Sequence, residues 1–116
     1  SLDLKLSDCL LMGFSQGGMM TFEVGNFLKE KLAGLVILSG RIMKEESVTN
    51  SVLQQTPIFI SHGEKDEVIP ITSFHKSINY LNSNKCNYES HALPNDEHNI
   101  SPEAIILLKN FIKKIL

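Results

Sequence analysis

The chain has 116 residues, of which 42% are hydrophobic and 21% are charged, and its formal net charge is -2. This length favours one domain with a single packed core, and the near balance of charges excludes an electrostatic surface for nucleic acid or anionic lipid. No apolar run approaches the roughly 20 residues that span a bilayer, and no secretory leader is recognised. We therefore expect one soluble, cytoplasmic domain over residues 1–116, without a nucleic-acid partner and without stable membrane insertion.

The cysteine and histidine positions give no pattern for a metal site. The two cysteines, Cys9 and Cys86, lie far apart, and neither belongs to a CxxC or Cys/His motif. The four histidines lack the i, i+4 spacing of a helical metal site. We expect two free thiols in a reducing compartment, no metal and no cofactor.

The first predicted unit is a buried strand followed by a helix. Residues 8–13, DCLLMG, form a nearly continuous apolar run that ends in glycine, which is typical of a strand buried on both faces. Over residues 17–32, large apolar side chains predict a helix with one packed face, within which Gly25 is a weak spot. These side chains are Met19, Met20, Phe22, Phe27 and Leu28.

Two further buried strands are predicted in the middle of the chain. The run LVIL at residues 35–38 is short and rich in β-branched residues, and the dipeptide SG ends it. The run PIFIS at residues 57–61 begins with proline, which a strand tolerates at its first residue. Residues 41–55 between them are polar and weakly patterned, so we expect a loop with room for one helical turn.

The last part of the chain repeats the alternation. Apolar residues share one helix face over residues 73–82, and residues 86–92 alternate weakly as a fourth strand. A final helix begins with Ser101 as its N-cap and Pro102 as its first residue. Alternating strands and helices predict an α/β fold, with a mostly parallel sheet of about four strands and flanking helices. Functional loops of such a sheet lie beyond the carboxyl ends of its strands.

A G-x-S-x-G motif, GFSQG at residues 13–17, directly follows the first strand. Such a motif is typical of a sharp strand-to-helix turn, too tight for side chains on either flank, that projects a nucleophilic serine hydroxyl. The following helix directs backbone N–H groups toward an oxyanion. The strand before it and the helix after it favour Ser15 as a nucleophile over a polar residue in an ordinary glycine-rich turn.

A serine nucleophile needs an imidazole to accept its proton and a carboxylate to orient that imidazole. The chain order in this architecture is serine, acid, histidine, which disfavours His62 and His75. His98 is the favoured base because it lies in the last loop, where it can reach the serine, and His91 in the fourth strand is the alternative. His62 is expected to form structural hydrogen bonds. Asp66, in the loop after the third strand, is favoured as the acid over Asp96, which lies two residues from His98.

Three blocks of sequence resemble the catalytic blocks of the phospholipase/carboxylesterase family of α/β-hydrolases, which includes acyl-protein thioesterases and lysophospholipases. The blocks are GFSQGG at 13–18, HGEKDEVIP at 62–70 and EHNIS at 97–101, and the resemblance covers nearly all of the chain.

The resemblance implies a role for each residue of the three blocks. It implies Ser15 as the nucleophile, Asp66 as the acid and His98 as the base in hydrolysis of an ester or thioester through an acyl-enzyme. It further implies that the backbone N–H of Gln16 is an oxyanion donor. The substrate class that it implies is a small acyl ester, a lysophospholipid or an acylated thiol.

Two features depart from the family pattern. Glu97 stands where the family usually has a small residue before the histidine. Members are roughly twice as long, and the half expected before Ser1 would hold the first strands and a loop with the second oxyanion N–H. We therefore expect the C-terminal half of an α/β-hydrolase fold. Its strand at residues 8–13 would then be an exposed apolar edge, which an N-terminal half or a second copy of the chain covers.

Three functions are open at this point. A serine esterase or thioesterase is favoured by the three ordered blocks. The alternative is a truncated, non-catalytic remnant that lacks the oxyanion loop and needs a partner segment. A peptidase of the same fold is less favoured, because no feature indicates peptide binding. Ile42, Met43 and residues 69–71 are candidates for an acyl pocket, against plain core packing.

Overall fold

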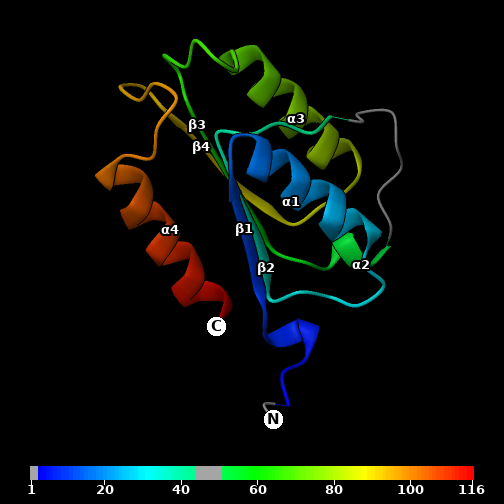
Figure 1. The fold of residues 1–116 in the computed structure, drawn as a ribbon. Coiled ribbons are helices and arrows are strands. Elements are labelled where there is room, and N and C mark those ends of the chain that lie inside the picture. Colours follow the sequence, from blue (N-terminus) through cyan, green and yellow to red (C-terminus); the bar gives the residue numbers. More distant parts are fainter. Residues whose placement is uncertain (1–2, 44–50) are drawn as a thin grey trace.

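One parallel β-sheet forms the centre of the computed structural model, which describes residues 3–43 and 51–116 (Figure 1). The strands are β1 (Leu10–Phe14), β2 (Gly34–Leu38), β3 (Ile58–Gly63) and β4 (Tyr88–Leu93). They lie in the order β1-β2-β3-β4, and each neighbouring pair is parallel. The α/β class and the four-stranded parallel sheet expected from the sequence are confirmed.

Helices cover both faces of the sheet and divide the apolar core into two layers. The helices are α1 (Gln16–Phe27), α2 (Ser51–Gln54) and α3 (Ile71–Ser83) on one face and α4 (Pro102–Ile115) on the other, and a 3-10 turn, η1 (Leu6–Asp8), precedes β1. Side chains alternate along β2, as a strand requires. Leu35 and Ile37 pack in the layer of α1 and α3, whereas Val36 and Leu38 pack in the layer of α4.

The packed face of α1 differs from the expected one. The helix ends at Phe27, and both Phe27 and Met20 are exposed, at 82% and 58%. Its buried residues are Phe22, as expected, together with Gly18, Thr21 and Gly25. A Cβ at Gly25 would lie 2.5 Å from Leu35 Cδ1, so α1 approaches β2 too closely for large side chains. Of the expected face, Phe22 is confirmed as buried, whereas Met20 and Phe27 are not, and Gly25 is required for the close packing of α1 on β2.

The other elements agree with the sequence to within a few residues. β3 continues to Gly63, two residues beyond the expected end. Ser101 is the N-cap of α4, and its Oγ accepts a hydrogen bond from the Ala104 N–H at 3.2 Å. Of the loop expected at 41–55, residues 44–50 lie outside the described residues, and the short helix α2 follows them.

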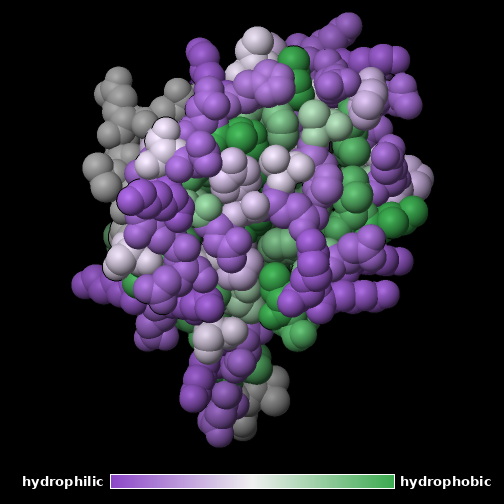
Figure 2. Space-filling view, turned by 180° about the vertical axis from the view of Figure 1, so that it is seen from behind, coloured by the Kyte–Doolittle hydropathy of each residue, from purple (hydrophilic) through white to green (hydrophobic). Residues whose placement is uncertain are grey.

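β1 lies at one edge of the described sheet, where it pairs with β2. Two of its apolar side chains reach the surface, Met12 at 52% and Phe14 at 38% exposure. Figure 2, seen from behind, shows further hydrophobic surface between hydrophilic side chains. No helix among the described residues has the length and hydrophobicity needed to cross a membrane.

Candidate active site

The loops that follow β1, β3 and β4 lie at one end of the sheet (Figure 1), and they carry the three residues favoured as nucleophile, acid and base. Ser15 directly follows β1, Asp66 lies in the loop after β3, and His98 lies in the loop between β4 and α4. Because the strands are parallel, their carboxyl ends share one edge, and the three loops meet there. The fold thus brings together residues that are 83 and 32 positions apart in the chain.

Ser15 occupies a strained turn between β1 and α1. Its φ is 58° and its ψ is -120°, a region that non-glycine residues rarely adopt and that costs about 1–3 kcal/mol. The Ser15 N–H donates to Leu38 O on the adjacent strand at 2.8 Å, and the Ser15 carbonyl accepts from Met19 N–H at 3.1 Å. These bonds hold the turn on both sides, so its position at the surface is fixed by the sheet and the helix.

The two glycines that flank Ser15 are not equivalent. A Cβ at Gly13 would lie 2.1 Å from Gly17 O, so the turn excludes a side chain at this position. A Cβ at Gly17 would meet no described heavy atom within 4 Å. The sequence-based expectation that both flanks are too tight was therefore right for Gly13 and wrong for Gly17, where the space beside the turn is open.

A chain of hydrogen bonds joins the three side chains. His98 Nδ1 lies 2.7 Å from Asp66 Oδ2, and His98 Nε2 lies 2.9 Å from Ser15 Oγ. An ionised carboxylate can only accept, so Nδ1 carries the hydrogen and donates it to Asp66. Nε2 of the neutral ring is then the acceptor for the Ser15 hydroxyl. This tautomer is the one that a general base needs.

Asp66 is held by several donors in a buried position. Its side chain is fully buried, and its Oδ1 accepts from the Val68 N–H and the Ile69 N–H, each at 2.8 Å. Burial raises the pKa of Asp66, but the hydrogen bonds from Ile69, His98 and Val68 outweigh it and hold the pKa below its ordinary value. Asp66 is therefore an anion at neutral pH and can stabilise a positive charge on His98.

The imidazole of His98 packs against an aromatic ring that the sequence analysis did not single out. The ring centroids of Phe14 and His98 are 5.0 Å apart at an interplanar angle of 38°, and the His98 side chain is 18% exposed. The position of Phe14, directly before the nucleophile at the end of a strand, is the signal that could have identified it.

Glu97, the residue that departs from the family pattern, does not displace the base. It is exposed and its N–H donates to Asn99 Oδ1, and His98 still reaches both of its partners.

The alternative residues have other partners. His91 Nε2 lies 2.7 Å from Glu89 Oε2, on the strand β4 itself. Asp96 Oδ2 accepts a hydrogen bond from the Ser101 hydroxyl at the start of α4. His62 Nε2 lies 2.7 Å from Ile69 O, which agrees with the structural hydrogen bond expected for it.

Gln16 is the first residue of α1, beside the Ser15 hydroxyl. The N–H groups of the first helical turn have no carbonyl partner within the helix, and the helix dipole places partial positive charge there. Gln16 is exposed.

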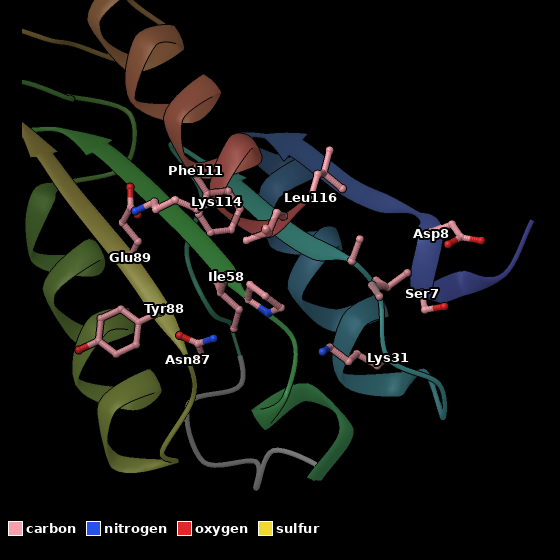
Figure 3. A pocket seen from close by; sticks show the side chains of 14 residues that line it. Ser7, Asp8, Lys31, Ile58, Asn87, Tyr88, Glu89, Phe111, Lys114 and Leu116 are labelled. Carbon is pink, nitrogen blue, oxygen red and sulfur yellow. The ribbon is translucent and has the colours of Figure 1, made fainter.

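The surface has one larger groove far from this site and one smaller hollow next to it. A groove of about 720 Å³ lies at the opposite end of the sheet, where Figure 3 shows Ile58 and Tyr88 at the starts of their strands and Phe111 above them. A smaller hollow of about 230 Å³ includes His98 and Val68 in its lining.

The residues considered for an acyl pocket do not line either hollow as a group. Ile42 is fully buried in the core and Ile69 is 7% exposed, whereas Met43 is 54% exposed. Ile42 therefore packs in the core. Among the described residues, no group of three His, Cys, Asp or Glu side chains is arranged to hold a metal ion.

The sequence profile of the Phospholipase/Carboxylesterase family matches residues 2–116. Acyl-protein thioesterase 1 of Saccharomyces cerevisiae is 32% identical over 121 residues, which cover 97% of this chain and 52% of the yeast protein. Acyl-protein thioesterase 1 homolog 1 of Dictyostelium discoideum is 32% identical over 109 residues, which cover 92% and 48%. The chain thus spans about half the length of the curated relatives it matches.

Solved structures share the same fold. SOBER1 of Arabidopsis thaliana superimposes with a TM-score of 0.87 at 23% identity, over 97% of this chain and 55% of SOBER1. Esterase PE8 superimposes with a TM-score of 0.86 at 26% identity, over 97% of this chain and 53% of PE8. The fold agrees with a profile match over nearly every residue, and we conclude that the chain belongs to the phospholipase/carboxylesterase family of α/β-hydrolases.

Proposed function

We propose that this protein is a serine hydrolase that cleaves carboxylic ester or thioester bonds, with Ser15 as nucleophile, His98 as general base and Asp66 as the orienting acid. The observation that carries the proposal is the pair of hydrogen bonds that His98 Nδ1–H donates to Asp66 Oδ2 at 2.7 Å and that His98 Nε2 accepts from the Ser15 hydroxyl at 2.9 Å. The distance between His98 Nε2 and Ser15 Oγ lies in the range over which a general base takes a proton.

The first half of the reaction forms an acyl-enzyme. His98 Nε2 accepts the hydroxyl proton while Ser15 Oγ attacks the carbonyl carbon. The buried anion of Asp66 stabilises the imidazolium and keeps its tautomer fixed. The imidazolium then donates its proton from Nε2 to the leaving alcohol or thiol. In the second half, His98 Nε2 takes a proton from water while the water oxygen attacks the acyl carbon. The bond from that carbon to Ser15 Oγ then breaks, the acid leaves, and His98 Nε2 returns its proton to Oγ.

The negative charge that develops on the substrate oxygen needs donors. The Gln16 N–H supplies one of them from the first turn of α1. We propose that a segment outside this chain supplies the second, as the family pattern implies. The loss of one such donor costs on the order of 100- to 1000-fold in turnover, so a chain without the second donor is a weak enzyme by itself.

The substrate class follows from the family. We propose a small acyl ester, a lysophospholipid or an acylated thiol. The names of the relatives support the thioester, because two of them are called acyl-protein thioesterase 1 or its homolog. Both leaving groups, an alcohol or a thiol, take one proton from His98 Nε2.

A second candidate function is a half-enzyme that acts only with a partner. Exposed Met12 and Phe14 on the edge strand and the open space beside Gly17 favour it. The partner would be an N-terminal half of the fold or a second copy of the chain, added to the edge of β1.

A fluorophosphonate probe, which forms a covalent bond with an activated serine, tests the first proposal. We expect the wild-type chain to be labelled at Ser15 and the Ser15→Ala variant to remain unlabelled. Absence of labelling in the folded wild-type chain and in a longer protein that contains it would contradict the proposal. If the chain hydrolyses p-nitrophenyl butyrate as a monomer at an ordinary enzymatic rate, with Ser15→Ala inactive, the half-enzyme proposal is wrong.

A further inference from the structure

A buried histidine lies next to the acid of the site and has no part in the proton transfers. His62 is the second last residue of β3 and is 1% exposed. Its Nε2 lies 2.7 Å from Ile69 O and 3.4 Å from Asp66 Oδ2. Because a carbonyl oxygen can only accept, Nε2 carries the hydrogen and donates it to Ile69 O.

Ile69 is also bound to Asp66. The Ile69 N–H donates to Asp66 Oδ1 at 2.8 Å. His62 therefore binds the carbonyl group of Ile69, and the N–H of the same residue binds the carboxylate of Asp66. The Val68 N–H occupies the same oxygen, Oδ1. With both amides on Oδ1, the carboxylate plane is set so that Oδ2 faces His98 Nδ1.

The other nitrogen of the His62 ring is not satisfied. Nδ1 is buried and has no hydrogen-bond partner in the part of the chain that the structure describes. A buried polar atom without a partner destabilises a fold, and an apolar side chain of similar volume would avoid that penalty. Phe74 packs at a centroid distance of 5.7 Å and restricts the ring. Packing alone does not explain a histidine at this position, whereas the hydrogen bond from Nε2–H to Ile69 O does.

We propose that His62 is a positioning residue for the acid: its Nε2–H, bound to Ile69 O, fixes the 66–69 turn so that Asp66 Oδ2 is directed at His98. This inference rests on the proposed function of Ser15, His98 and Asp66. Without the bond, the turn shifts and Oδ2 moves away from Nδ1. His98 would then lose the partner that fixes its tautomer.

Two substitutions separate the hydrogen bond from the volume of the ring. His62→Leu removes the N–H donor and fills most of the space of the imidazole ring with an apolar side chain. His62→Gln keeps a side-chain N–H that is expected to reach Ile69 O. His91→Leu is the matched control, since His91 lies on the neighbouring strand and pairs with Glu89 rather than with the acid loop. Each variant is made in the full chain, and its thermal unfolding is recorded first.

Two readouts are then compared. One is the NMR signal of the His98 Nδ1–H in its hydrogen bond to Asp66. The other is the labelling of Ser15 by a fluorophosphonate probe, split into a maximal rate constant and a half-saturating concentration. A misplacement of about 1 Å costs on the order of 100-fold in rate, so we expect His62→Leu to lower the maximal rate constant by about 10- to 100-fold. The half-saturating concentration stays the same, and the Nδ1–H signal is lost. His62→Gln retains both, as does His91→Leu.

The outcomes decide the inference in either direction. A folded His62→Leu variant with the wild-type signal and rate would overturn it, and so would equal losses in the Leu and Gln variants. If the Leu variant does not fold, the Gln variant decides: a retained Nδ1–H signal supports the positioning role, and a lost signal contradicts it. If neither the wild-type chain nor a longer protein that contains it is labelled, the proposed function fails, but the Nδ1–H signal still tests whether His62 positions Asp66.

Discussion

Asp66 and Ser15 lie on the same chain of hydrogen bonds but have opposite surroundings. On the acid side, Asp66 is 6% exposed, and the backbone around Asp96 passes so close to β3 that a Cβ at Gly63 would lie 2.3 Å from Asp96 O. On the nucleophile side, Phe14 is 38% exposed, and a Cβ at Gly17 would meet no described atom within 4 Å. The described chain therefore buries the carboxylate of Asp66 and leaves the nucleophile side open, which agrees with the proposal that a further segment completes the site.

The largest expected effect concerns the acid. Asp66→Asn keeps the size of the side chain but removes the charge that stabilises the His98 imidazolium and fixes its tautomer. We expect the rate of fluorophosphonate labelling at Ser15 to fall by on the order of 10⁴-fold, as in other serine triads. Asp96→Asn is the matched control, because Asp96 is also buried but accepts from Ser101. Equal losses in the two variants would contradict the role of Asp66.

A pair of glycine substitutions tests the packed side against the open side. Gly63→Ala forces a Cβ against the Asp96 carbonyl, and we expect a loss of about 3 kcal/mol in the free energy of unfolding. Gly17→Ala, in the first turn of α1, meets no such contact and is expected to keep or raise that free energy by up to about 1 kcal/mol. Urea denaturation measures both. Comparable destabilisation by the two changes would show that the nucleophile side is not open.

Two neighbouring positions of the sheet test its exposed edge. Met12 and Val36 are partners in the register of β1 and β2, but Met12 is 52% exposed and Val36 is fully buried. We expect Val36→Ala to lower the free energy of unfolding by about 2 kcal/mol and Met12→Ala by about 0.5 kcal/mol. In a longer protein whose added segment covers β1, the cost of Met12→Ala should rise. An unchanged cost there would mean that nothing packs on this side chain.

The smallest expected effect is on the pH dependence of stability. The folded-state pKa of Asp66 lies below its ordinary value, so the folded state favours the anion. This contribution to stability is fully present above the unfolded-state pKa of about 3.9 and is lost as the pH falls through the lower folded-state value. Urea titrations at pH 7 and in the acid range check this. The wild-type chain should lose more stability on acidification than Asp66→Asn, and an equal loss would contradict the assignment.

Much of the site could be predicted from the sequence because it depends on residues that are close together in the chain. The turn at Ser15 requires a strand, a G-x-S-x-G segment and a helix in succession, and the helix α1 (Gln16–Phe27) follows the turn directly. The start of α4 at Ser101 likewise depends only on the residues of its first turn. Their positions in the loops after the strands then favoured Asp66 and His98 over their alternatives, and in the structure His98 is hydrogen-bonded to both Asp66 and Ser15.

The errors came from contacts between distant segments. Gly18, Thr21 and Gly25 belong to the buried face of α1 together with Phe22, because the helix lies close to β2 at Gly25, and no spacing of apolar residues within the helix indicates that distance. Gly17 belongs to the motif, but its surroundings depend on what packs beside β1.

The sequence by itself determined the order of strands and helices, the turn that carries Ser15 and the family to which the chain belongs, since these are set by residue types at short spacings. Only the tertiary structure decided that Phe14 packs on His98, that His62 binds Ile69 O, and that one side of the site is packed and the other open. Those features are distances between side chains of different elements, and such distances exist only after the parallel strands have aligned their carboxyl ends.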